Sequence, residues 1–119
     1  MTNPTAVPKG QGAVLDGVAV SAKAALTRLA EKPHLLCHAG FFLARLAQAS
    51  DASADILQES TRQRHFDLAE LFAFACPAQA AVPTAKGIAR ALRVESDSEE
   101  QALLASADAL LERLANPKQ

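Results

Sequence analysis

The chain has 119 residues and a formal net charge of −1 at pH 7; half of its residues are hydrophobic, but it contains no Trp and no Tyr. This length allows one domain with one core, and a composition rich in Ala and Leu favours helices. The nearly neutral charge argues against a strongly basic nucleic-acid-binding surface. No apolar run approaches the roughly 18 residues that a membrane-spanning helix needs.

The first 12 residues are rich in proline and glycine and are predicted to form a flexible arm, followed by a single domain over residues 13–116. The start of the chain has no apolar segment typical of a secretion signal, so we expect a cytoplasmic protein. The two cysteines, Cys37 and Cys76, lie in apolar surroundings, which predicts reduced, buried thiols.

Short strands and a helix are predicted in the first part of that domain. Residues 13–20 form two short strands around an Asp16-Gly17 turn. A helical pattern begins at Ser21 and ends at Pro33. The apolar run 34–37 then predicts a buried strand.

Helices dominate the prediction from Gly40 onward. Apolar residues recur at helical spacing after Gly40, whereas the polar stretch 47–65 predicts either one exposed helix or an irregular connection. A strong helix is predicted over 66–75, with Asp67 in its first turn. These elements indicate a helix-rich α/β domain.

Two N-terminal helix caps are predicted in the last third of the chain. Thr84 caps a short helix that contains Ile88. The sequence Ser96-Asp97-Ser98-Glu99 is typical of a capping box and starts the longest helix, which ends at Asn116-Pro117.

The segment from Leu35 to Phe42, read Leu-Leu-Cys-His-Ala-Gly-Phe-Phe, resembles the second motif of DnaQ-like 3′–5′ exonucleases. In that family an apolar strand is followed by His-Asn-Ala-x-Phe-Asp, and the Asp binds the catalytic metal. Phe42 occupies this position here, and a phenyl ring cannot replace an oxygen ligand of a hard divalent cation.

A second segment, Asp67-x-x-Glu70-Leu71 with Pro77 after it, is similar to the Asp-Thr-x-Glu-Leu-Ala…Pro segment of the same family. The family's general-base His and last metal-binding Asp correspond to Glu99 and Leu104. Its opening Asp-x-Glu motif has no counterpart in residues 1–20. Two-metal hydrolysis needs these oxygen ligands, so the resemblance implies a degenerate exonuclease-like domain that is not an enzyme.

A closer resemblance is to the N-terminal region of DinG-like ATP-dependent DNA helicases, and it covers about residues 12–114. It rests on the string Glu70-Leu71-Phe72-Ala73-Phe74, followed by Pro77-Ala78, Val82-Pro83-Thr84 and Gly87. The chain contains no phosphate-loop motif and no Asp-Glu-Ala-His box, so it cannot hydrolyse ATP by itself. The resemblance implies a non-catalytic accessory domain that docks on the helicase motor or positions DNA.

The fold implied is a small, incomplete ribonuclease-H-like or exonuclease-like sheet, made of residues 13–20 and 34–37 and covered by about five helices. An incomplete sheet with wide apolar helix faces also permits another function. The chain could be a stand-alone interaction module that homodimerises through these faces, with Phe72, Leu110 and Leu111 as the candidate interface.

Other groups of polar residues give weaker indications. Arg62 and Arg64 belong to a small basic cluster and are the candidate contacts for a weak interaction with DNA. His34, Cys37 and His38 do not have the spacing of a common zinc site, and we expect a partly exposed histidine pair at the strand end beside a buried thiol. No cofactor and no metal are expected.

Overall fold

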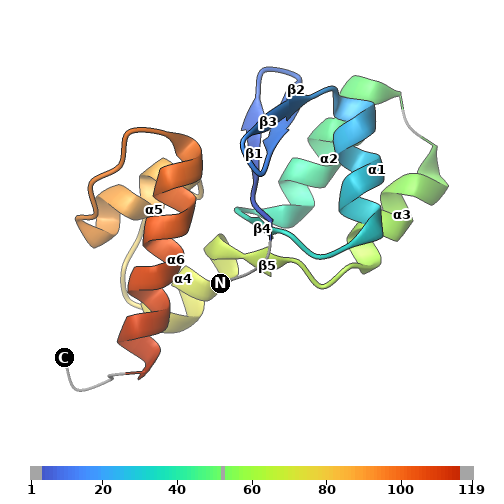
Figure 1. Ribbon diagram of the computed structural model, residues 1–119. Helices are drawn as coiled ribbons and strands as arrows, with labels where there is room; N and C mark the ends of the chain where they lie inside the picture. Colours follow the sequence, from blue (N-terminus) through green and yellow to red (C-terminus); the bar gives the residue numbers. More distant parts are fainter. Residues whose placement is uncertain (1–3, 52, 116–119) are drawn as a thin grey trace.

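The computed structural model describes residues 4–51 and 53–115 (Figure 1). The strands are β1 (Ala6–Lys9), β2 (Gly12–Leu15), β3 (Val18–Val20), β4 (Leu35–Leu36) and β5 (Phe66–Asp67). The helices are α1 (Ala22–Glu31), α2 (Ala39–Ser50), α3 (Ala54–Arg62), α4 (Leu68–Ala75), α5 (Ala85–Leu92) and α6 (Glu99–Ala115). The helix-rich α/β class predicted from the sequence is confirmed.

The strands form two small sheets that meet at Thr5. The first sheet is antiparallel in the order β1-β2-β3, and the predicted turn between β2 and β3 is confirmed, with positive φ angles of 51° at Asp16 and 89° at Gly17. In the second sheet β4 and β5 are parallel. A parallel bridge pairs Thr5 with Leu35 and thus places β4 beside the start of β1. The neighbouring strands are therefore β3, β2, β1, β4 and β5.

This arrangement corrects the prediction for the N-terminal arm. Residues 1–3 lie outside the described residues, but Ala6–Lys9 form β1, and Thr5 and Ala6 are almost completely buried. Proline and glycine do not prevent this strand, because Gly10 provides the positive φ of the turn into β2 and Pro8 faces a paired strand on one side only.

The structure also contains strands that the sequence pattern did not indicate. Residues 34–37 do not pair directly with 13–20, because β1 lies between them. Phe66 and Asp67 form β5 rather than the first turn of a helix, and α4 begins at Leu68. Two-residue strands such as β4 and β5 contain too few residues to show a periodic pattern.

The predicted cap at Thr84 is confirmed, Ser21 adds a cap that was not predicted, and the cap of the last helix is shifted. Ser21 caps α1 and Thr84 caps α5, and each side chain accepts a hydrogen bond from the backbone N–H three residues later. The cap of α6 is Ser98, whose Oγ accepts from the N–H of Gln101 at 3.1 Å, so the capping residue lies two positions after the predicted Ser96. The predicted end at Asn116-Pro117 lies outside the described residues.

The polar stretch 47–65 holds the end of α2 and the whole of α3. α3 is not a free surface helix, because it packs against α1, and Ile56 and Leu57 contact the core beneath it.

Two cores lie on opposite faces of the strands, where one core was expected. One core belongs to β2, α1, α2 and α3, and the other to α4, α5 and α6. Leu36 and Ala6 face the first core, whereas Leu35 and Val7 face the second. Adjacent strand residues point to opposite faces, so β1 and β4 separate an α1–α3 layer from an α4–α6 layer (Figure 1).

Candidate functional site

The carboxyl ends of β4 and β5 are joined by the carboxylate of Asp67. Its oxygens accept hydrogen bonds from the backbone N–H groups of His38 at 2.7 Å, Ala39 at 2.8 Å and Ala69 at 3.0 Å. Asp67 therefore caps its own helix α4 and also holds the start of α2, where His38 has a left-handed φ of 60° and no side-chain cap of its own.

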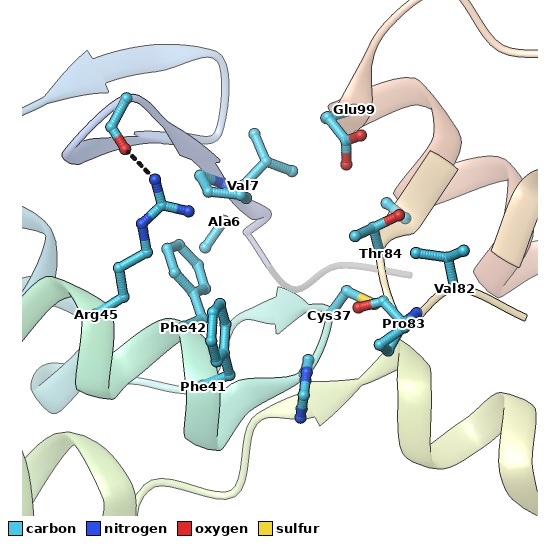
Figure 2. Close-up of a pocket in the computed structure, with 14 residues that line it drawn as sticks. Ala6, Val7, Cys37, Phe41, Phe42, Arg45, Val82, Pro83, Thr84 and Glu99 are labelled. Atoms are coloured by element: carbon cyan, nitrogen blue, oxygen red, sulfur yellow. Dashed lines mark hydrogen bonds between the residues drawn. The ribbon is translucent and has the colours of Figure 1, made fainter. Parts of the chain in front are cut away.

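A cavity of about 470 Å³ opens beside this junction, between the two helical layers (Figure 2). We call it the interlayer cleft. It is lined by β1, the first turns of α2, the segment 82–85 and the first residue of α6. The carboxyl ends of parallel strands are the usual place for a ligand site in α/β folds, so this cleft is the candidate functional site.

Apolar side chains make up most of the wall of the interlayer cleft. The apolar lining residues are Ala6, Val7, Pro8, Phe41, Phe42, Val82, Pro83 and Ala85. Two side chains of opposite charge, Arg45 and Glu99, lie on opposite sides of it in Figure 2. A guanidinium N–H of Arg45 donates to the carbonyl oxygen of Gly10 at 3.0 Å.

The positions that the resemblance to exonucleases would assign to metal ligands carry no carboxylate in this cleft. β1, which lines the cleft, supplies no carboxylate either, because its residues are Ala, Val, Pro and Lys. Phe42 is 4% exposed and belongs to the core of the α1–α3 layer, and Leu104 is a surface residue of α6. Within residues 4–51 and 53–115, no three His, Cys, Asp or Glu side chains are grouped to hold a metal ion.

Cys37 lines the cleft, but its surroundings do not favour the reactive thiolate. Its thiol donates a long hydrogen bond of 3.7 Å to the carbonyl oxygen of Pro83. Burial, together with the negative charges of Asp67 and Glu99, raises the pKa of the thiol to about 12. A raised pKa favours the protonated thiol, which is a weaker nucleophile than the thiolate. Both cysteines are free, and of the two only Cys76 is fully buried.

The histidines are arranged differently from the expected exposed pair. His34 is only 2% exposed, and its backbone N–H donates to Nδ1 of His65 at 3.0 Å. Nε2 of His65 lies 3.0 Å from the carbonyl oxygen of Ser60, so the neutral ring with its proton on Nε2 satisfies both contacts. Burial lowers the pKa of His34 and of His65. His38 is exposed and stacks on Phe41, with ring centroids 5.5 Å apart.

The remaining candidate residues do not converge on the cleft. Arg62 and Arg64 are exposed at the end of α3, and neither lines the cleft. Phe72 and Leu110 are 6% and 0% exposed and belong to the core of the α4–α6 layer, which excludes them from a surface interface. Leu111 is 42% exposed and stays a candidate.

Sequence reasoning missed Arg45, Val82 and Pro83 as site residues. Arg45 is far in sequence from the Val82-Pro83 segment, and no motif links it to that segment.

Comparisons with protein-family models, with curated proteins and with solved structures found no match to this chain. In the described part of the chain, no helix combines the length and the apolar character needed to cross a bilayer.

Proposed function

We propose that this chain is a non-catalytic accessory domain of a DinG-like DNA helicase, which docks on the helicase motor or helps to position DNA in the cytoplasm. The observation that carries this proposal is the apolar lining of the interlayer cleft at the carboxyl ends of β4 and β5. Hydrolysis with two metal ions needs several oxygen ligands around one point, and the cleft offers the single carboxylate of Glu99.

Asp67 gives independent support to a non-catalytic role. The resemblance to exonucleases includes the segment Asp67-x-x-Glu70-Leu71. In this structure both carboxylate oxygens of Asp67 accept hydrogen bonds from backbone N–H groups at the starts of two helices. Its carboxylate contributes to the assembly of the two layers.

The proposal is tested by binding to a motor. A DinG-like helicase motor without its own N-terminal region is titrated with the chain, and both complex formation and the rate of DNA unwinding are measured. We expect saturable binding and a changed unwinding rate. An Arg62→Glu/Arg64→Glu double variant separates the two roles, since a DNA-positioning domain loses its effect on unwinding while a docking domain keeps it. Lys23→Glu/Arg28→Glu on α1, which also reverses two exposed positive charges, is the matched charge control.

Absence of nuclease activity is the second part of the test. Labelled single-stranded DNA is incubated with the chain and Mg²⁺ or Mn²⁺, and we expect no degradation. Metal-dependent degradation that disappears in Asp67→Ala while the variant stays folded would overturn the proposal.

Homodimerisation is a second candidate function, and exposed leucines on α6 favour it. Leu104, Leu111 and Leu114 are each about two-fifths exposed, at 39%, 42% and 39%. Residues 104 and 111 are seven positions apart and share one helix face. Light scattering of the chain is expected to give a dimer that Leu111→Glu dissociates, and a monomer at all concentrations would exclude this candidate.

A further inference from the structure

We propose that the interlayer cleft is a docking site for a peptide segment of a protein partner. This segment carries one bulky apolar side chain between an acidic residue and a basic residue. This inference rests on the proposed function in one respect: the partner is identified as the helicase motor. The recognition chemistry is derived from the cleft itself.

The apolar part of the inference comes from the size and exposure of the walls. A volume of about 470 Å³ accommodates a large side chain and its neighbours. Phe41 and Val82 line the cleft and are 62% and 63% exposed. Large apolar side chains left in water around a concavity mark a place where an apolar anchor of a partner is buried.

The charged part comes from Arg45 and Glu99 on the opposite sides of the cleft (Figure 2). The guanidinium of Arg45 donates a hydrogen bond to the carbonyl oxygen of Gly10, and among the described residues neither Arg45 nor Glu99 has an ion-pair partner. Each can therefore pair with an opposite charge of an incoming chain. A partner that carries both signs, one on each side of its anchor, complements the site.

A peptide fits this chemistry better than a nucleic acid. Binding to phosphates needs several cationic side chains, whereas Arg45 is the one Lys or Arg side chain that lines the described cleft, and Glu99 repels phosphate. Strand addition along β1 is also disfavoured, because Pro8 has no N–H to donate. Recognition then depends on side chains rather than on backbone pairing.

The chain itself provides a clean optical test. Because it contains no Trp and no Tyr, a single Trp in a synthetic peptide reports its own surroundings without background fluorescence. The probes are peptides with one Trp between two charged residues, spaced by alanines, in three versions: Asp and Lys, two Asp, or two Lys. We expect saturable binding with a blue shift of the Trp emission, strongest for the version with one Asp and one Lys.

Variants of the intact chain assign the binding to the cleft. Phe41→Ala is expected to weaken binding by about tenfold, the loss of a central apolar contact. Phe74→Ala removes a phenyl ring outside the cleft that is even more exposed, at 76%, and is expected to leave binding unchanged. Arg45→Glu should turn the preference to the peptide with two Lys, and Glu99→Arg to the peptide with two Asp.

The results separate this inference from the proposed function. If the motor binds the chain but Phe41→Ala and the charge variants bind it equally well, the docking inference fails and the accessory role stands. If the peptides bind as expected but no motor does, the accessory role fails. The inference is also overturned by the absence of any saturable shift, by unchanged charge preference, or by an oligothymidine that binds in the cleft and displaces the peptide.

Discussion

The two helical layers bury their apolar residues to different extents. In the α1–α3 layer, the strands and helices cover the large apolar side chains except Val18 and Phe41. The α4–α6 layer leaves Phe74, Leu104, Leu111 and Leu114 in water, and Val82 lies beside it on the cleft. Both layers pack on the same short strands, so the difference does not come from the sheet. It teaches that the α4–α6 layer leaves more apolar surface in water than the α1–α3 layer does. A partner is expected on that surface and at the cleft between the layers, to which the α1–α3 layer contributes Phe41.

Leu35 and Leu36 allow the two cores to be compared at adjacent positions. Both are completely buried, at 1% and 0% exposure, but they face different cores. Leu35→Ala and Leu36→Ala are each expected to lower the free energy of unfolding by about 2–5 kcal/mol. Urea unfolding followed by circular dichroism measures this, and a single transition is expected in both variants. Two separate transitions would show that the layers fold independently.

Asp67 joins the layers, since it caps α2 in one and α4 in the other. Asp67→Ala removes the acceptor of three backbone N–H groups, and two lost caps correspond to about 1–4 kcal/mol. Thermal unfolding of Asp67→Ala measures the loss. Glu70→Ala, an exposed acidic residue in the first turn of α4, is the matched control and should change the stability by only a few tenths of a kcal/mol. Equal losses in both variants would contradict the double-capping role.

The His34–His65 contact makes the other end of β4 and β5 sensitive to pH. Burial lowers the pKa of both rings below the ordinary value of 6.5. Below about pH 6.5 the unfolded chain therefore binds more protons than the folded chain, so the free energy of unfolding is expected to fall as the pH drops from about 6.5 toward 5.5 and to be nearly constant above it. Urea unfolding between these pH values measures the slope.

His38 supplies the control for this pH dependence, because its ring is exposed. His38→Ala should keep the slope, whereas His65→Gln should reduce it. A stability that does not change between pH 5.5 and 7.5 would contradict the buried, neutral state of His34 and His65.

The exposed face of α6 should give the smallest change in folding stability. Leu111→Glu and Leu104→Glu replace side chains that are two-fifths exposed, so each is expected to change the free energy of unfolding by less than about 0.5 kcal/mol. The same changes should reduce binding of an apolar fluorescent dye. A stability loss of several kcal/mol would show that these leucines are buried within the folded chain and would remove the contrast between the layers.

The parts of the fold that follow local chemistry could be predicted from the sequence. Thr84 caps its helix as expected, the helix expected from Ser21 begins there, and the Asp16-Gly17 turn lies between two strands. These features depend on a few neighbouring residues, so their signal is contained in a short window. β1 was missed for the opposite reason: its pairing partners are distant, and its own window contains Pro8 and Gly10.

The candidate site was much less predictable. The apolar faces of α4 and α6 correctly indicated that these residues are buried. A sequence pattern does not show whether other elements of the same chain or a partner protein cover such a face. The prediction therefore placed Phe72 and Leu110 at an interface, whereas they lie in a core of this chain. Phe42, which occupies the place of a metal ligand in the resemblance to exonucleases, is buried in the core of the α1–α3 layer. The cleft itself combines Arg45 with Val82 and Glu99, and only the tertiary fold brings these segments together.

The position of β1 between the two cores has a practical consequence for the choice of expression boundaries. Ala6 and Val7 supply neighbouring side chains to opposite cores, and Thr5 bridges to Leu35. A shortened chain that starts at residue 13, where the sequence pattern first becomes regular, would lack the strand that both helical layers share. Such a truncation is expected to yield insoluble or partly folded material, and fusion tags are therefore better placed ahead of residue 4 than within the hairpin.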